Sequence, residues 1–476
     1  MQTDRSCPSV PKPNDVHLAP WERRAQAPNR AVVLSCGALL ACSGAALAQT
    51  ALPSEPPPGY AAALATTTVN GSVLGQAVYQ TCITGSNARS GSIENQRFQE
   101  DCNRLVGSSF NNPASSANAL GLLAADQVNA QNSSAVRLAA LGVSAVHGRL
   151  QRIRLAEHQG TDAALYAGND SFAEGTGGGA SADLANGPFG AFVTFDSASG
   201  DEDETPYQTG YEFNRWSFLG GLDYRFDDRL VSGLALRYGE GDFDFDRNRG
   251  DMDSESWGLI GYASYSLPDG FFIDGALGYS QNDYSLKRRI NYTLDSAVTD
   301  QIAASDPEAA LWNFNIGAGY SLFRDAWSIT PSARLNYVNN DVDGYRERMS
   351  NPGMNAGGLA LSVDSQTYES LSSELGFQIA RAISHTSGVI QPQFRLAWIH
   401  EYRDDQERVG ATFVNDINQQ PLYILTTKPD PDYFELGLGV SAQFANGRSA
   451  FLSYNSLLGY DNVRYDAISA GFRLEF

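Results

Sequence analysis

Few residues in this sequence have the types and spacing that catalysis requires. The chain of 476 residues contains five histidines, and His400 followed by Glu401 is the pair that most resembles a general base with a carboxylate. The alternation of the segment places His400 on the same side as Phe394 and Trp398, so we expect it at the rim of an apolar surface. No nucleophile elbow, zinc-protease helix or phosphate loop is present. The sequence therefore predicts no enzyme and no cofactor.

A run of carboxylates between residues 241 and 255 is the second candidate for chemistry, because such groups are the ligands that calcium prefers. Its spacing does not match a calcium-binding loop, and Gly250 is misplaced. Asp242, Asp244 and Asp246 alternate, which predicts a solvated acidic rim on the inner side of a mouth, without a bound metal. The net charge of −21 also argues against nucleic-acid binding, since phosphates would be repelled.

Residues 1–48 have the features of an export signal. Positive charge precedes an apolar stretch, and the small residues up to Ala48 offer a cleavage site. A membrane anchor and lipidation at Cys42 are the alternatives. We expect the chain to leave the cytoplasm by this signal.

Two cysteines, Cys82 and Cys102, follow that signal. An even pair in an exported protein predicts a disulfide, and metal ligation is the weaker alternative because no histidine lies near either residue. The bridge would join two short helices between about residues 73 and 106. We expect this helical region and the rest of the chain to have separate cores.

The segment before residue 188 is predicted in two parts. Residues 49–158 form a helical region with a Pro-rich start, and within it apolar residues spaced three and four apart predict a long helix over about 119–157. That helix either packs on a small helical domain or belongs to a pore. Residues 159–187 form a Gly-rich linker.

Residues 188–476 alternate between apolar and polar side chains, which is the period of a β-strand. The predicted strands are 188–196, 210–226, 229–245, 252–267, 270–286, 309–323, 326–340, 364–383, 388–403, 432–444, 448–459 and 463–476. Short turns alternate with longer links, such as 287–308, 341–363 and 404–431, which is typical of an outer-membrane barrel. The predicted fold is therefore mainly β, a twelve-stranded antiparallel transmembrane barrel preceded by a small disulfide-bonded α-helical region.

Charged residues also occur on the polar side of these strands. They are Asp223, Arg225, Arg237, Arg334, Glu374, Arg395 and Arg473. The interior of such a barrel admits little more than one helix, about 10–12 Å across. We expect these charges to pair with one another or with a segment in the lumen, where they would plug and align.

The chain resembles a known family in this part. The twelve strands, the terminal sequence AGFRLEF and the preceding helix resemble the translocator domain of autotransporters, the type V secretion proteins. The segment with the two cysteines, followed by RLAALGVSAVHGRLQRIR, is similar to the helical region that precedes the barrel in some members. The resemblance implies that Phe472, Leu474 and Phe476 form the signal read by the outer-membrane barrel-assembly machinery.

The predicted function is an outer-membrane barrel that anchors, and translocates or displays, its own short N-terminal helical region. If that region reaches the surface, residues 159–187 are expected to thread the lumen. The alternatives are a porin-like or structural barrel with a periplasmic helical binding module, and an outer-membrane enzyme. The expected partners are outer-membrane lipid, the assembly machinery and an unidentified surface or host ligand.

Overall fold

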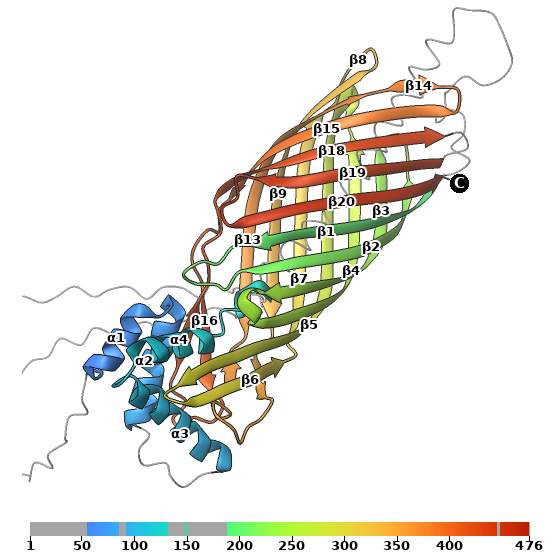
Figure 1. Cartoon of the computed structure of the whole chain (residues 1–476). Coiled ribbons are helices and arrows are strands. Elements are labelled where there is room, and N and C mark those ends of the chain that lie inside the picture. The colour runs from blue at the N-terminus through green and yellow to red at the C-terminus, as the bar shows by residue number, and fades with distance from the viewer. Residues whose placement is uncertain are drawn as a thin grey trace, which may run out of the picture. The chain divides into compact units, whose positions relative to one another are not determined.

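The alternating part of the chain folds into a closed antiparallel barrel of twelve strands, as the sequence predicted (Figure 1). Strand β1 pairs with both β2 and β20, so the ring has no free edge. In order around the ring, the strands are β1 (Phe189–Glu202), β2 (Tyr211–Arg225), β3 (Leu230–Phe245), β4 (Gly250–Ser266), β5 (Phe271–Leu294), β7 (Glu308–Tyr320), β9 (Trp327–Val342), β13 (Gln366–Arg381), β15 (Gly388–Glu401), β18 (Asp432–Phe444), β19 (Arg448–Leu458) and β20 (Val463–Glu475).

The structure is a computed structural model that describes residues 55–84, 92–131, 148, 150, 188–444 and 448–475. The predicted export signal and the Gly-rich linker lie outside these residues, as does Phe476. Among the helices that are described, none is long and apolar enough to cross a membrane.

The barrel wall is apolar outside and polar inside. Leu222, Leu234 and Leu236 on the outer face are each about 60% exposed, and Trp257 and Tyr265 lie on that face too. The buried residues of the same strands alternate with them and include many polar and charged side chains. This is the two-faced pattern that period two imposes on a strand.

Short connections join the strands at the end where β20 finishes. There β8 (Leu322–Arg324) and β14 (Ile383–His385) extend two hairpins, and the 3-10 turn η4 (Pro268–Gly270) joins β4 to β5. Asp269 and Gly270 have φ angles of 66° and 90°, a left-handed backbone for which Gly and Asp are suited.

The connections at the other end contain secondary structure of their own. Strand β5 continues into a hairpin with β6 (Ala297–Ser305), which β11 (Arg348–Met349) joins. A separate four-stranded sheet consists of β10 (Tyr345–Arg346), β12 (Leu361–Val363), β16 (Arg408–Phe413) and β17 (Leu422–Leu425). The sequence predicted only longer links over 287–308, 341–363 and 404–431 and did not find these strands, most of which have two to six residues and pair with segments distant in sequence.

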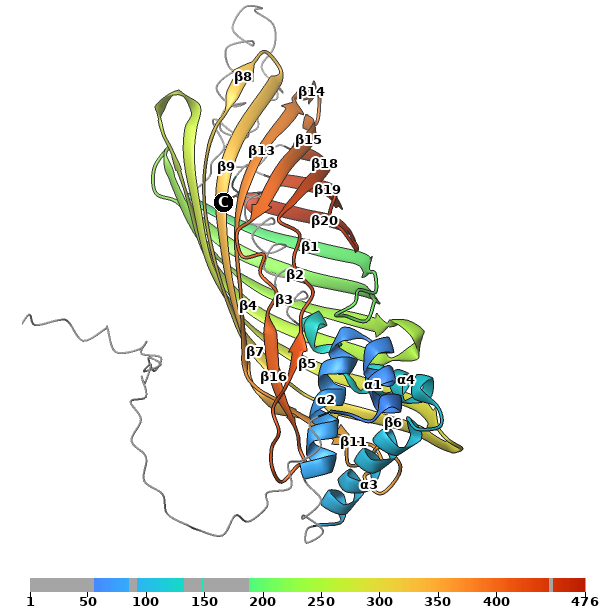
Figure 2. The same ribbon diagram turned by 90° about the vertical axis from the view of Figure 1, so that its left-hand side faces the viewer.

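Four helices lie at this same end, beside β5, β6 and β16 (Figures 1 and 2). They are α1 (Pro58–Thr66), α2 (Val69–Thr84), α3 (Ile93–Ser108) and α4 (Pro113–Leu123). Ser92 caps α3 by accepting from the Asn95 amide at 3.4 Å, and Asn112 caps α4 through the Ser115 amide at 3.2 Å. Proline at the first turn of α1 and α4 suits a helix start.

The long helix predicted over 119–157 does not form as one piece. Helix α4 ends at Leu123, and Ala125 has a left-handed φ of 55°. Most of the rest of that stretch lies outside the described residues. A helix C-terminus has four carbonyl groups without helical partners, and here a side chain of β5 donates hydrogen bonds to two of them.

The helices and the long connections share one hydrophobic core. Phe98 and Cys102 of α3 belong to the same buried cluster as Tyr292 of β5 and Phe413 of β16. The Phe98 and Phe413 ring centroids are 5.2 Å apart. The expectation of separate cores was thus wrong. We call this assembly of α1–α4, the β5–β6 hairpin, β11 and the four-stranded sheet the head.

Candidate functional site

Four charged side chains on four neighbouring strands, β9, β13, β15 and β18, form one network in the lumen. Arg334 donates to Glu374 at 2.8 Å, and Arg395 bonds both Glu374 and Glu435. The side chains of Arg334 and Glu374 are 5% and 8% exposed, so each charge is held by an opposite one, as burial requires. The sequence named three of these four residues and missed Glu435.

The other predicted lumen charges lie on β2, β3 and β20. Asp223 and Arg473 form an ion pair at 3.9 Å, and Arg237 donates to the Ser217 hydroxyl at 3.3 Å. Arg225 is half-buried on the same side of the wall. All seven predicted residues therefore line the interior, in separate groups along the wall.

The mouth of the barrel beneath the head is filled by aromatic side chains. Phe213, Phe243 and Phe245 are each 4% exposed or less, and they cluster with Tyr211 and Ala130. Because Phe243 and Phe245 point inward, their neighbours on β3 point outward. The predicted inner acidic rim was therefore wrong: Asp242 and Asp244, with Asp246 after them, are exposed and outside the lumen.

The catalytic candidates point in opposite directions. His400 Nδ1 lies 2.9 Å from Asp432 Oδ1 on the outer side, where Asp432 also accepts from the Trp398 indole at 3.0 Å. Glu401 is buried and accepts from the amides of Leu371 and Arg403. Within the described residues, no three acidic, histidine or cysteine side chains are grouped as a metal site.

Leu150 lies inside the lumen. Its side chain is 2% exposed and packs among Phe192, Leu219 and Tyr262, which face inward near the end where β1 begins. Gln131 lies at the opposite end, where its carbonyl accepts from the Tyr284 hydroxyl at 3.4 Å. In chain order, then, Gln131 is beneath the head, Leu150 is inside the barrel, and Phe189 begins the wall at the far end.

One arginine on β5 joins the helices to the barrel. Arg288 is fully buried and forms two bonds with Glu347, at 2.9 and 2.7 Å. Its third nitrogen donates to the carbonyls of Leu122 and Leu123 at 3.3 Å. A cation at a helix C-terminus also stabilises the helix dipole, so this contact ends α4 and fixes it to β5.

Asparagines make a second set of contacts between the helices and the long connections. Asn70 of α2 donates to the carbonyls of Tyr207 and Leu425 at 2.8 and 3.0 Å, and accepts from the Leu425 amide at 2.8 Å. Asn129 donates to the Tyr207 carbonyl at 3.2 Å. These bonds satisfy backbone groups that the long connections leave unpaired.

Asp126 is a buried carboxyl group in this contact. It is 3% exposed, and its Oδ1 has no hydrogen-bond partner. Burial raises its pKa from 3.8 to about 7, although the charge of Arg249 and a hydrogen bond with Asn70 both act to lower the pKa. The contact between the helices and the long connections thus contains a carboxyl group that is protonated below about pH 7.

Comparison with known proteins identifies the family. The family model described as the autotransporter beta-domain matches residues 191–455, which is more than half of the chain. The chain belongs to the autotransporter beta-domain family. Membership implies a location in the outer membrane.

Two curated proteins are similar to this autotransporter. It is 24% identical over 277 residues to a putative uncharacterized protein, YaiT, of Escherichia coli K12, which covers 57% of this chain and 25% of that protein. It is 28% identical over 228 residues to an uncharacterized protein in the trpE-trpG intergenic region of Pseudomonas putida, covering 44% of this chain and 34% of the other. The chain spans only about a quarter to a third of these relatives.

Two solved barrels are also similar. The translocator domain of NalP from Neisseria meningitidis has a TM-score of 0.48 and 15% identity, covering 70% of this chain and 98% of that domain. The beta domain of the Bordetella autotransporter BrkA has a TM-score of 0.44 and 22% identity, covering 61% and all of that domain.

The sequence of this autotransporter contains a pattern that indicates the inward direction of Arg288, and our strand prediction did not use it. Strand β5 was predicted to end at residue 286, yet its alternation continues: Arg288, Ile290, Tyr292 and Leu294 are all buried. That pattern predicts a longer strand. It cannot predict that Glu347 and the end of α4 would meet Arg288, because those segments are distant in sequence.

Proposed function

We propose that this chain is an outer-membrane autotransporter that exports its own N-terminal helices through its barrel and retains them on the surface as part of the head. The observation that carries the proposal is the order of Gln131, Leu150 and Phe189 along the barrel axis. A chain that passes from the head through the lumen to the far end would have this order. The lumen-side charges then align and plug around the passing segment.

The packing of the head supports retention. A released passenger would need a core of its own, but the core of α1–α4 includes residues of β5, β12, β16 and β17. The occupied lumen and the filled mouth also argue against a porin-like barrel with a periplasmic helical module. Outer-membrane lipid would contact the apolar outer face. We assign no catalytic role to the chain.

The export signal and the disulfide complete this proposal. Residues 1–48 would direct passage through the inner membrane. Cys102 is 1% exposed, and its sulfur lies 3.4 Å from the Val78 carbonyl oxygen. Val78 precedes Cys82 by one helical turn of α2, which supports a bridge between Cys82 and Cys102.

Labelling of cysteines on intact cells tests the orientation and the bridge together. We expect Phe110→Cys, at a head position 63% exposed, to react with a membrane-impermeant maleimide. The matched variant Thr386→Cys, in the turn between β14 and β15, should react only after the outer membrane is opened. Because Cys102 is buried, the wild-type protein is labelled after denaturation, where it should react only once it has been reduced.

The reverse pattern, with Thr386→Cys labelled on intact cells and Phe110→Cys protected, would place the head in the periplasm. Labelling of Cys82 or Cys102 without reductant would contradict the bridge alone.

The C-terminal strand is proposed to carry the assembly signal. Phe472 and Leu474 are both 41% exposed on the outer face of β20. Deleting Phe476, or changing it to aspartate, should cost the finished barrel little, because charged residues near the membrane interface cost about 0–1 kcal/mol. We therefore expect a large loss of outer-membrane protein, measured by fractionation, to reflect failed recognition. The control is Leu458→Asp, an exposed residue on the outer face at the end of β19. Equal losses of outer-membrane protein in both variants would contradict an assembly signal at Phe476.

A further inference from the structure

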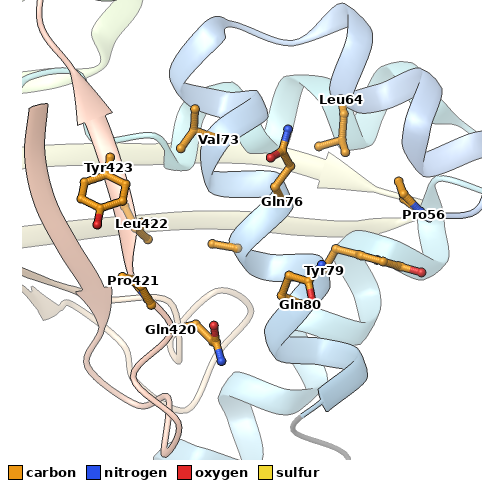
Figure 3. A pocket seen from close by; sticks show the side chains of 11 residues that line it. Pro56, Leu64, Val73, Gln76, Tyr79, Gln80, Gln420, Pro421, Leu422 and Tyr423 are labelled. Carbon is orange, nitrogen blue, oxygen red and sulfur yellow. The ribbon is translucent and has the colours of Figure 1, made fainter. Parts of the chain in front are cut away.

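A groove of about 440 Å³ opens on the head between helix α2 and strand β17 (Figure 3). One side is formed by α2, including Gln76 and Tyr79, and the other by the start of β17, with Tyr423, and by Pro421 just before it. Its volume lies within the range of sites that hold small ligands or peptide segments, about 300–1,000 Å³. The two sides come from opposite ends of the sequence, so the groove exists only in the assembled head.

The lining combines aromatic, prolyl and amide side chains with aliphatic ones. Tyr423 is 49% exposed on one side, and Gln76 and Gln80 are exposed on the other. None of the lining residues carries a charge, although the chain has a net charge of −21. A charged ligand would lose its hydration here without gaining a partner, whereas a neutral one with backbone carbonyls would find amide donors.

At the edge of this groove, a tyrosine of the chain binds a proline-rich segment of the same chain. Pro56 lines it, and the next residue, Pro57, has φ −55° and ψ 150°, close to the polyproline II conformation. The Tyr79 hydroxyl donates to the carbonyl of Glu55 at 2.9 Å. A tyrosine that bonds a carbonyl of an extended proline-rich segment is how aromatic grooves bind polyproline II peptides.

We propose that this groove binds an uncharged, proline-rich segment of a partner protein in the polyproline II conformation. Prolines of the partner would lie against the exposed ring of Tyr423. Gln76 would donate to one of its carbonyls, as Tyr79 does to Glu55. A polyproline II segment is already extended, so it loses little conformational entropy on binding.

Calorimetry on the full chain in detergent tests this proposal with a capped oligoproline as the probe. Gly-Ser peptide of the same length is the control ligand. We expect the oligoproline to bind and the control not to. Tyr423→Ala should weaken binding about tenfold or more, as truncation of a central aromatic anchor commonly does. Gln76→Ala should weaken it less.

Phe110→Ala, at an exposed head position outside the groove, should bind like the wild type. Equal binding by wild type and Tyr423→Ala would overturn the proposal, as would binding of a neutral maltooligosaccharide in place of oligoproline. Binding that appears only after residues 49–54 are removed would also overturn it, because the chain's own segment would then be the occupant. Because the measurement uses purified protein, it does not depend on which side of the membrane the head occupies.

Discussion

Replacing Arg288 by methionine will loosen the helices from the barrel wall while the barrel stays intact. The variant leaves the Glu347 carboxylate, 2% exposed, with the Leu361 amide as its remaining bond. It also removes the donor to two carbonyls of α4. Breaking one side of a buried ion pair costs about 3–5 kcal/mol.

The measurement is the urea midpoint at which the head becomes open to protease, with the barrel followed by its heat-modifiable mobility in electrophoresis. The neighbouring Lys287→Met is the matched control, because its partner Asp251 is 2.9 Å away and both side chains are more than 40% exposed. Such a surface pair contributes about 0–1 kcal/mol. Equal midpoints for the two variants would show that Arg288 does not hold the head.

Replacing Asp126 by asparagine will make the head more stable at neutral pH and reduce its dependence on pH. The folded-state pKa of Asp126 is about 7, raised from 3.8 by burial. Between these values the unfolded chain releases the proton and the folded head keeps it, so the wild-type head loses stability as pH rises. Across that window the loss is on the order of 4 kcal/mol, and it persists above pH 7.

The charged groups that act on Asp126 are Arg249, Arg288 and Glu204, and the variant leaves all three in place. Asp101, whose pKa burial also raises, is present in both proteins, so their difference isolates Asp126. Pulse proteolysis in urea at about pH 5.5 and about pH 8 should give a larger gain for Asp126→Asn at the higher pH. A gain that is the same at both pH values would refute the assignment.

The barrel could be predicted from the sequence because the pattern that specifies each strand lies within that strand. Each strand shows its own alternation, and the apolar residues at positions such as Leu234 and Leu236 mark the outer face without knowledge of any neighbour. The twelve strands and the inward direction of Glu374 and Arg395 follow from that parity. The direction of Asp242 was predicted wrongly because the rim was expected to be polar inside, whereas Phe243 and Phe245 fill it.

The head could not be predicted in the same way, because its contacts join distant segments. Strand β10 has two residues and β12 has three, too few to show a period. The helical pattern near Ala119 predicted a continuing helix, but α4 ends where Arg288 meets its carbonyls. Tertiary contact overrides local propensity there.

The shared core of the head also constrains when it can form. Asn70 bonds the Leu425 backbone across a sequence separation of 355 residues, so one half of the core leaves the ribosome long before the other. Contacts at such separation form late, because closing a long loop costs entropy first. On the proposed route, the early half would cross a pore too narrow for folded protein. On that route, the separation of the two halves in sequence would keep the exported half from folding prematurely in the periplasm, and each molecule would carry the surface on which that half folds after arrival.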